Sequence, residues 1–211
     1  FVDPPLRVIK AIERDTAIVL VSSPAALGKS TVAAEIARRQ NAPLWDLSRA
    51  MVGTGSFEGT LVRSFGAAAY SQVEESLKKG SALFVIDSLD EGQLRVPATS
   101  FEEFMSEVCA FLASTRPPHP PLVLLGRSDA ALWMSLWLED KGVAFSHVAL
   151  DFFFEDQSYE FVARWLDSRG HTAHRGYPDA FNRACRSLFQ EIASALAAPG
   201  KTAATWEDPS V

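Results

Sequence analysis

The chain has 211 residues, a net charge of −6 and a hydrophobic content of 47%. No apolar run approaches the roughly 18 residues of a membrane-crossing helix, so we expect no membrane span. The acidic balance argues against a dedicated nucleic-acid-binding module, which normally presents a basic surface, although a local basic face stays open as an alternative. The length fits one domain, or one domain with a small appendage.

The first residue is Phe1, and the chain does not open with a charged segment followed by an apolar one. We therefore expect a piece of a longer protein, without a signal peptide. The two cysteines, Cys109 and Cys185, are too few for a disulfide framework in a chain of this length. We expect both to be reduced core residues in different helices, which favours a cytoplasmic protein.

Residues 1–14 contain two prolines followed by the apolar residues Leu6, Val8, Ile9 and Ile12. This spacing predicts a short helix that packs at the edge of the core and leads into the first strand. A contact with a bound ligand is the less favoured alternative.

Residues 16–22 form an uncharged run rich in β-branched side chains, which is typical of a central parallel strand covered on both faces. Residues 31–39 place Val32, Ile36 and several alanines on one helical stripe. Between them lies the sequence Ser23-Pro24-Ala25-Ala26-Leu27-Gly28-Lys29-Ser30. A strand, a tight loop that ends in Gly-Lys-Ser and a helix together form the phosphate-binding P-loop arrangement. The alternative is an ordinary turn between a strand and a helix.

The residue types of this loop explain how it would bind a nucleotide. Backbone N–H groups of the loop and of the first helical turn point at an anion, and the helix dipole favours negative charge. Lys29 would reach the β- and γ-phosphates of ATP, and the Ser30 hydroxyl would be a ligand of Mg²⁺. Ser23 stands where the usual motif has a glycine, so a residue with a Cβ must hold that backbone site. The predicted phosphate-binding residues are Ser23, Pro24, Ala25, Ala26, Leu27, Gly28, Lys29, Ser30 and Thr31.

Three segments separate this motif from the next one. Residues 43–47 predict a short second strand, and residues 51–56 predict a flexible loop whose two glycines lack the context of a dinucleotide-binding motif. Residues 57–79 predict a long amphipathic helix, broken near Gly66, with two lysines at its end and a glycine after it.

Residues 82–92 predict an apolar strand that is followed directly by acidic residues. Ligands of open α/β sheets bind at the carboxyl ends of strands, so Asp87, Asp90 and Glu91 are placed at a ligand-binding edge. Clustered carboxylates need a nearby positive charge, and Mg²⁺ bound to a nucleotide would supply it. We expect Asp87 to hold the metal, directly or through water, and Asp90 or Glu91 to polarise the attacking water. The alternative is an acidic, solvated turn.

The run from Phe84 to Glu91 resembles the Walker B segment of NACHT-type signal-transduction ATPases, the STAND class. In that class a small residue follows the metal-binding aspartate, and an acidic pair follows two positions later. Ordinary AAA+ proteins are less similar, because they usually place a glutamate directly after the aspartate, where this chain has Ser88. The resemblance extends over roughly residues 16–169, with motifs in the two nucleotide segments and in one further strand.

Residues 100–115 predict a helix with Ser100 as its N-cap, followed by a proline-rich loop. Residues 121–129 then predict an apolar strand with a polar tip. The resemblance implies that this strand is inserted between the P-loop strand and the Walker B strand, and that it carries a sensor residue near the γ-phosphate. The matching residue is Arg127, whose guanidinium suits phosphate oxygens. A surface arginine at a strand end is the alternative.

Residues 130–141 predict a helix used in packing, and residues 143–154 predict a fifth strand whose last three phenylalanines fill the core or a domain junction. The helices that we expect from residue 155 and over residues 179–198 resemble the small helical domain that follows the ATPase core in the STAND class. Between them, His171 and His174 lack a full ligand set, so we expect no metal site there. Residues 199–211 are expected to be a linker or a mobile terminus.

The resemblance implies an α/β P-loop NTPase fold. Residues 1–154 would form a parallel five-stranded sheet of strand order 5-1-4-3-2 sandwiched by helices, and residues 155–211 a helical appendage and linker. The expected function is that of a slow, Mg·ATP-dependent molecular switch. By resemblance, the domain would self-associate within a larger signalling or antiphage defence protein, whose sensor and effector regions lie outside this chain. ATP is preferred over GTP by analogy alone.

Two other functions stay open. A DNA-transaction ATPase of the AAA+ type would need a basic face and sustained turnover. A non-hydrolysing nucleotide-binding scaffold would tolerate the departures at Ser23 and Ser88. Binding of nucleic acid is thus left open, whereas a membrane is not an expected partner.

Overall fold

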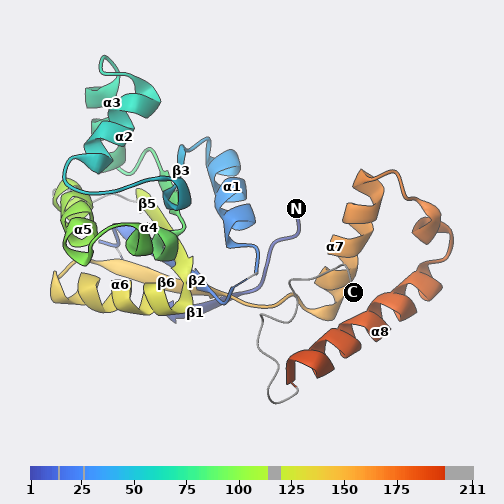
Figure 1. The fold of residues 1–211 in the computed structure, drawn as a ribbon. Coiled ribbons are helices and arrows are strands. Elements are labelled where there is room, and N and C mark those ends of the chain that lie inside the picture. The colour runs from blue at the N-terminus through green and yellow to red at the C-terminus, as the bar shows by residue number, and fades with distance from the viewer. Residues whose placement is uncertain (14, 26, 114–119, 198–211) are drawn as a thin grey trace. The chain divides into compact units, whose positions relative to one another are not determined.

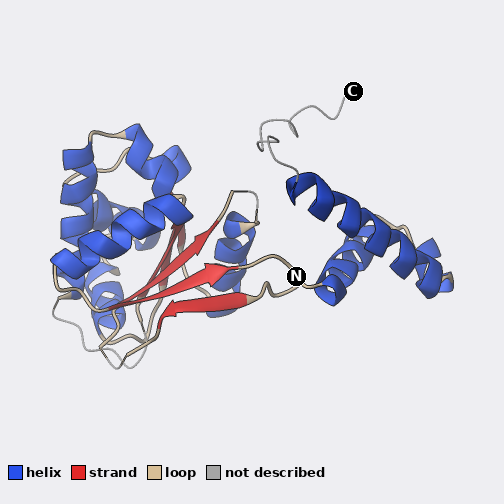
Figure 2. Ribbon diagram, turned by 90° about the horizontal axis from the view of Figure 1, so that it is seen from below, coloured by secondary structure: helices blue, strands red, loops and turns tan. Residues whose placement is uncertain are grey.

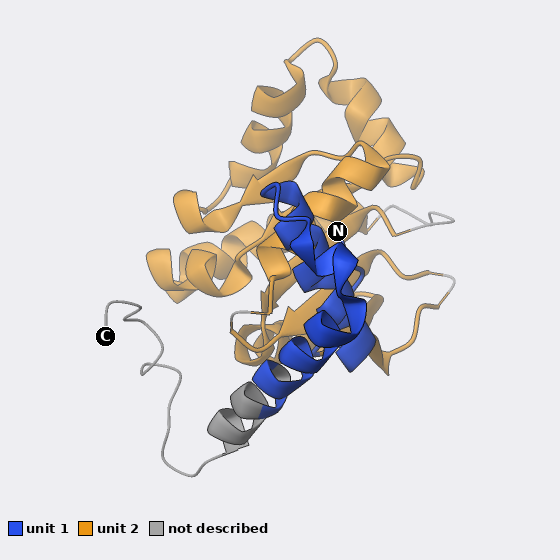
Figure 3. Cartoon of the chain, turned by 90° about the vertical axis from the view of Figure 1, so that its right-hand side faces the viewer, with its two compact units in different colours: residues 1–5, 152–211 blue, residues 6–151 orange. Residues whose placement is uncertain are grey.

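The computed structural model describes residues 1–13, 15–25, 27–113 and 120–197. The end of the helix expected over residues 100–115, most of the proline-rich loop and the linker expected over residues 199–211 lie outside the described residues. The chain divides into two compact units, residues 6–151 and residues 1–5 with 152–211 (Figure 3).

The larger unit is built on a six-stranded sheet in the order β1-β6-β2-β5-β4-β3. Every neighbouring pair is parallel except β1 and β6, which run antiparallel. The strands are β1 (Leu6–Lys10), β2 (Ile18–Ser23), β3 (Leu44–Asp46), β4 (Phe84–Asp87), β5 (Leu122–Arg127) and β6 (Phe145–Leu150). Because β5 lies between β2 and β4, the carboxyl ends of these three parallel strands meet at one edge of the sheet.

The N-terminal strand is the main departure from the expected fold. Residues 6–10 form β1 instead of a short helix, and Leu6 and Val8 pair with Leu150 and Val148 of β6. This pairing satisfies backbone groups of β6 that a helix at the same edge would leave without partners. The expected count of five strands is therefore wrong, and so is the order of the whole sheet. The order 5-1-4-3-2 describes only the parallel part, β6-β2-β5-β4-β3.

Helices lie on both sides of this sheet (Figures 1 and 2). On one face α1 packs against β4 and β5, and on the other face α4 and α6 pack against β5, with α5 packed against α4. The helices of this unit are α1 (Lys29–Gln40), the 3₁₀ turn η1 (Leu47–Arg49), α2 (Ser56–Phe65), α3 (Tyr70–Lys78), α4 (Leu89–Arg95), α5 (Ala98–Leu112) and α6 (Ser128–Asp140).

Alternation along the strands divides the apolar side chains between two clusters, one on each face. In β5, Leu122 and Leu124 belong to the larger cluster, whereas Val123 and Leu125 pack with Ala33 of α1 in the smaller one. A strand that is covered on both faces has a continuous apolar sequence, which is the pattern that located β5. The same reasoning holds for β2 and β4.

Two helical segments differ from their expected bounds. Gly66, at φ +83°, separates α2 from α3, which confirms the expected break and gives two helices where one long one was predicted. Helix α5 begins at Ala98 after Pro97, so the predicted N-cap at Ser100 is wrong. Proline suits the start of a helix because its fixed φ fits the first turn and it has no N–H group to leave unpaired.

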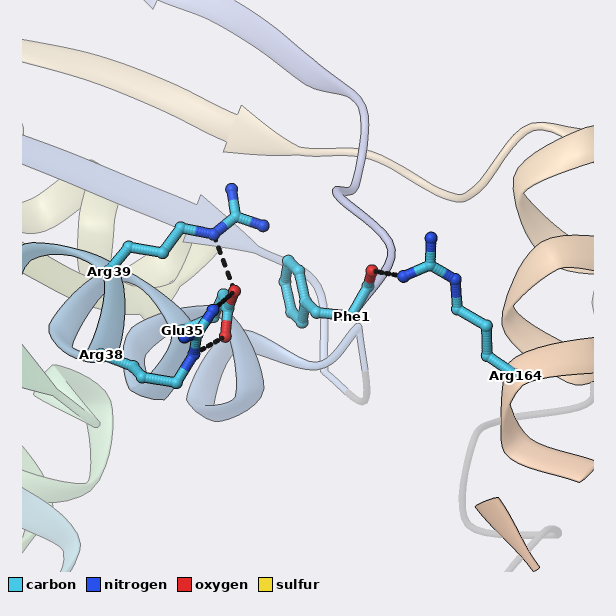
Figure 4. A network of polar contacts seen from close by, with 5 residues as sticks. All are labelled: Phe1, Glu35, Arg38, Arg39 and Arg164. Carbon is cyan, nitrogen blue, oxygen red and sulfur yellow. Dashed lines mark hydrogen bonds and ion pairs between the residues drawn. The ribbon is translucent and has the colours of Figure 1, made fainter. Parts of the chain in front are cut away.

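The smaller unit contains α7 (Glu155–Ser168), the 3₁₀ turn η2 (Ala173–Gly176), α8 (Pro178–Ala197) and the first five residues. Side chains of α7 hold the N-terminal residues in place. Arg164 donates a hydrogen bond to the carbonyl of Phe1 (Figure 4), and Gln157 Nε2 donates to the carbonyl of Asp3 at 2.9 Å. The start of the chain therefore belongs to the helical unit and not to the sheet.

The three phenylalanines after β6 lie outside the strand that was expected to contain them. Phe153 packs against Phe161 of α7 with ring centroids 5.7 Å apart. Phe152 and Phe154 are exposed, so of the two expected places, the core or a domain junction, the core is wrong for both.

Both cysteines are free and lie in different helices, Cys109 in α5 and Cys185 in α8. Cys109 is buried and Cys185 is half-buried. Within the described part of the chain, no helix has the length and the apolar character that crossing a membrane requires.

Candidate functional site

The carboxyl ends of β4 and β5 and the start of α1 border a cavity of about 220 Å³. Its lining consists of Ala25, Gly28, Lys29, Ser30, Thr31, Ser88, Asp90, Glu91 and Arg127. Five of the nine residues predicted to bind phosphate are thus on the lining, together with the acidic pair and the arginine at the end of β5. The fold brings into one place two motifs that the sequence separates widely.

Three of the other predicted loop residues are not on the lining, and the fourth is not described. Ser23, Pro24 and Leu27 are not on the lining, and Ala26 lies outside the described residues. Ser23 is the fully buried last residue of β2 and pairs in register with Arg127. Among the described non-glycine residues only Asn41 and Ser88 have a positive φ, so the Cβ of Ser23 causes no strain of the kind expected from the missing glycine.

Gly28 is the loop position at which the backbone conformation favours glycine. It is the N-cap of α1 and has φ +75°, a left-handed conformation that L side chains rarely adopt. A Cβ added there would lie 4.0 Å from the Cβ of Thr31, which is an ordinary contact. The requirement for glycine therefore comes from the backbone conformation and not from lack of space.

The first turn of α1 is open to an anion. No side chain caps this helix, and its first turn contains no acidic residue. The amide groups at the start of a helix have no partner within the helix, and the dipole makes this end positive. The side chain of Lys29, the first residue of α1, makes no hydrogen bond or ion pair with any other described residue. The helix start and the ammonium group together offer positive charge at one wall of the cavity.

Asp87, the last residue of β4, is buried, and its Oδ1 has no hydrogen-bond partner among the described residues. A buried carboxylate oxygen without a partner is costly unless a cation or a donor meets it. Asp87 is not itself on the cavity lining, although the next residue, Ser88, is. The carboxylate of Asp87 and the hydroxyl of Ser30 are oxygen donors of the type that Mg²⁺ prefers, so the residues present fit this ion.

Asp46 was not among the residues predicted from the sequence, although it lies at the carboxyl end of β3, next to β4. Asp46 ends β3 and pairs in register with Asp87 of the neighbouring strand β4. Burial alone would raise the pKa of Asp46, but hydrogen bonds from Ser48 and Ser88 and the charge of Arg49 outweigh it and lower that pKa. The side chain of Ser88, at φ 64°, is thereby held next to the cavity.

Asp90 and Arg127 form an ion pair on the lining. Arg127 Nε lies 2.9 Å from Asp90 Oδ2, and the backbone N–H of Arg127 donates to Asp90 Oδ1 at 3.1 Å. Glu91 lies on the same lining, and its side chain makes no hydrogen bond or ion pair with other described residues. The two adjacent carboxylates, which the sequence could not distinguish, therefore have different surroundings.

A buried polar pair has one member, Ser22, just before the loop in the sequence. His147 Nε2 of β6 is 2.9 Å from Ser22 Oγ of β2, one residue before Ser23, and both residues are buried. Burial lowers the pKa of His147, and the positive charge of Arg7 lowers it further. The sequence gives no signal for this pair, because its two members are distant in the chain and meet only through the pairing of β2 with β6.

The two histidines of the smaller unit are not part of the cavity. His174 Nε2 lies 3.3 Å from Asp167 Oδ1, and Arg175 pairs with the same carboxylate. His174 also packs against Phe181, with the rings tilted by 46° and their centroids 5.1 Å apart. Across the described residues no group of three or more histidine, cysteine, aspartate or glutamate side chains is placed to hold a metal ion.

No protein-family model and no curated protein sequence matches this chain. Among solved structures, the AAA domain of FIGL-1 in complex with ADP aligns with a TM-score of 0.42 and 16% identity, over 72% of this chain and 49% of that one. A RuvB mutant from Thermotoga maritima aligns with a TM-score of 0.41 and 15% identity, over 85% and 57% of the two chains. The RuvB Holliday junction branch migration motor of the same organism aligns with a TM-score of 0.38 and 17% identity, over 86% of this chain and 57% of that one. The chain spans about half the length of these structures, and likenesses at this level assign no family to it.

Proposed function

We propose that this chain is a P-loop NTPase domain that binds a nucleoside triphosphate with Mg²⁺ and hydrolyses it slowly. The bound nucleotide, triphosphate or diphosphate, would set the state of a molecular switch. The observation that carries the proposal is the cavity of about 220 Å³, which has the start of α1 and Lys29 on one side and Asp90, Glu91 and Arg127 on the other. Two sequence motifs for one ligand thus border the same cavity.

The phosphate chain is the part of the nucleotide that this cavity suits. Ligand pockets usually measure about 300–1,000 Å³, and the 220 Å³ here is smaller than that. Amide groups from Gly28 to Thr31 would bind the phosphate oxygens, and the ammonium of Lys29 would contact the β- and γ-phosphates. The sugar and the base would lie outside the cavity, where no described residue of its lining selects adenine over guanine.

Ser30 and Asp87 would hold the metal ion. When bound, Mg²⁺ neutralises charge on the phosphates and orients them. The Ser30 hydroxyl lies in the first turn of α1, and the buried Asp87 supplies a carboxylate oxygen that has no hydrogen-bond partner in the described part of the chain. Two protein ligands are sufficient for an ion that keeps several waters and binds phosphate oxygens as well.

Hydrolysis requires a group that orients the attacking water and a group that stabilises the charge of the γ-phosphate. Glu91 would orient the water, because its carboxylate has no partner among the described residues that would compete for it. Arg127 would contact the γ-phosphate, because its guanidinium is on the cavity lining. Loss of the γ-phosphate would then change the contacts of β5 and α6, the elements that Arg127 joins.

The biological setting that we propose follows the sequence resemblance. The domain would act in a STAND-class protein of the NACHT type, in which the nucleotide state controls self-association. Sensor and effector regions outside this chain would supply the trigger and the output. The cavity geometry supports nucleotide binding, and the resemblance of residues 84–91 supports the class.

The test is nucleotide binding measured by isothermal titration with Mg²⁺ and the non-hydrolysable analogue AMP-PNP. We expect binding by the wild type and a loss of about 100-fold or more in Lys29→Ala, because that change removes the main cation that faces the phosphates. Lys79→Ala is the matched control, since Lys79 is an exposed lysine that pairs with Glu75 and is absent from the cavity lining. Equal affinity of the Lys29 variant and the wild type would refute the proposed site.

A non-hydrolysing nucleotide-binding scaffold is the second candidate. Both carboxylate oxygens of Asp90 are engaged by Arg127, so only Glu91 of the acidic pair is left for a water molecule. Phosphate release from ATP separates the two functions. Binding of AMP-PNP without any release of phosphate from ATP after long incubation with Mg²⁺ would favour the scaffold.

A further inference from the structure

We propose that Asp90 is a positioning residue for Arg127 and does not itself activate water, so that the acidic pair has divided roles. This inference rests on the proposed function, because it concerns how the same cavity distinguishes a triphosphate from a diphosphate. Arg127 would recognise the terminal phosphate, Asp90 would fix Arg127 in place, and Glu91 would remain as the carboxylate for water.

The contacts of Asp90 are unusual because both reach the same partner residue. One carboxylate oxygen accepts from the backbone N–H of Arg127 at 3.1 Å, and the other lies 2.9 Å from its side-chain Nε. The contact with the N–H group fixes the backbone position of Arg127, and the contact with Nε fixes the position of its guanidinium group. A single carboxylate thus restrains both the backbone and the guanidinium group of Arg127.

The exposure of the two side chains shows which one is the anchor. The side chain of Asp90 is 12% exposed and that of Arg127 is 52% exposed. An ion pair with one well-shielded member is screened less by water than an ordinary surface pair. Arg127 would otherwise have many rotamers available, so the shielded carboxylate reduces the entropy that binding a phosphate would cost.

The guanidinium keeps donors for a ligand. Neither Nη group of Arg127 donates a hydrogen bond to another described residue, which leaves both available to a ligand. Guanidinium N–H groups bind phosphate oxygens in pairs, which a lysine cannot do. Because Arg127 and Lys29 line the same cavity, one phosphate chain could contact both.

The same contacts argue against Asp90 as the group that polarises water. Its Oδ1 accepts a hydrogen bond from the backbone N–H of Arg127, and its Oδ2 forms an ion pair with the guanidinium Nε at 2.9 Å. Both oxygens of Asp90 are therefore in contact with Arg127, so a water molecule would have to displace one of these contacts. Glu91, the next residue on the lining, has no such partner among the described residues.

A double-mutant cycle tests whether Asp90 acts through Arg127. The four proteins are the wild type, Asp90→Ala, Arg127→Ala and the double variant, and titration with Mg²⁺ gives their affinities for AMP-PNP and for ADP. We expect each single change to lower the preference for AMP-PNP over ADP by about tenfold, since a hydrogen-bonded charge is lost in each case. The double variant should lose no more than Arg127→Ala alone.

Two further variants keep the test decisive. Asp90→Asn preserves the volume of the side chain and loses the charge that holds Nε, so it should show the same loss of preference if Asp90→Ala fails to fold. Asp129→Asn, in the first turn of α6, removes an exposed carboxylate that is absent from the cavity lining and should leave the preference unchanged.

Phosphate release gives the outcome that would overturn the inference. If Asp90→Asn slows release from bound ATP as strongly in the Arg127→Ala background as in the wild type, Asp90 acts directly and is not a positioning residue. Additive losses in the binding cycle would lead to the same conclusion. If the wild type binds neither nucleotide, the proposed function itself is wrong, and that result is distinct because it appears before any variant is compared.

Discussion

His147 of β6 and Ser22 of β2 share a buried hydrogen bond of 2.9 Å directly before the loop that starts α1. The bond joins two neighbouring parallel strands within the sheet. Burial lowers the pKa of His147 below its ordinary value of 6.5, and the nearby charge of Arg7 adds to this shift. A protonated His147 would be a buried cation that forms no ion pair with any described residue, so the folded state favours the neutral ring.

The pair predicts how the stability of the fold depends on pH. Between pH 6.5 and the lower pKa of the folded state, the unfolded chain binds a proton that the folded chain does not. The free energy of unfolding should therefore fall as the pH falls through this window, by up to about 1.4 kcal/mol per pH unit. Urea unfolding of the wild type and of His147→Gln across this range measures the contribution.

Glutamine is a suitable replacement because its amide does not titrate and can still form a hydrogen bond with Ser22. The variant should lose the part of the pH dependence that lies just below pH 6.5. An identical pH dependence in both proteins would show that His147 titrates in the same way in the folded and unfolded chains.

Glu35 predicts a second pH effect, in a more acidic range. Hydrogen bonds from Arg38 and then Arg39 lower the pKa of Glu35 to about 2, despite a smaller opposing effect of burial (Figure 4). A carboxyl group with a lowered pKa stabilises the fold above its unfolded pKa of 4.5, and this contribution is lost as the pH falls from 4.5 towards 2. The melting temperature of Glu35→Gln should therefore be slightly lower than that of the wild type near neutral pH.

Because the effect depends on charge, the difference in melting temperature should shrink on acidification and on addition of salt. Calorimetry at a series of pH values measures it. A difference that stays constant across the acidic range would mean that the substitution acts through packing or helix propensity.

The close approach of Leu47 in η1 to Gly92 in α4 predicts that this position does not tolerate a larger side chain. A Cβ on Gly92 would lie 2.8 Å from the Cβ of the fully buried Leu47, closer than real side-chain contacts allow. Gly92→Ala should therefore lower the free energy of unfolding by about 1–3 kcal/mol, as overpacked cores do. Gly59→Ala is the matched control in helix α2, where a new Cβ meets nothing within 4 Å.

The control should be neutral or stabilising by up to about 1 kcal/mol, since alanine is the better helix former. Urea unfolding of both variants gives the comparison. If the two changes have equal effects, the close approach of Leu47 to Gly92 does not constrain the fold.

The elements that the sequence predicted best are those whose pattern is local. The apolar runs of β2, β4 and β5 are continuous because both faces of these strands are covered, and Gly28-Lys29-Ser30 marks the start of α1. These features needed no knowledge of distant parts of the chain.

The features that the sequence did not predict depend on pairing between distant segments. The apolar residues of β1 fit a short helix as well as a strand. This segment is a strand because it pairs with β6, which lies near the other end of the sequence of the larger unit. The contact of Asp90 with Arg127 is of the same kind, because β4 and β5 bring their ends together only once the sheet has formed. The role of each carboxylate in the acidic pair was therefore out of reach of the motif alone.

Glu91→Gln predicts the loss of hydrolysis without the loss of binding. The Glu91 carboxylate lies on the cavity lining without a partner among the described residues, so it is available to orient a water molecule. Removal of a general base or of a water-orienting group typically lowers a rate by about 10²–10⁴-fold. We expect phosphate release to slow by at least about 10²-fold, while the affinity for AMP-PNP stays within about twofold of the wild type.

Glu102→Gln provides the control for this measurement, because Glu102 is an exposed glutamate of α5 that is absent from the lining of the same cavity. It should release phosphate at the wild-type rate. If Glu91→Gln also turns over normally, another group must orient the water. If it weakens AMP-PNP binding as much as it slows release, Glu91 contributes to binding in the ground state and not to the chemical step.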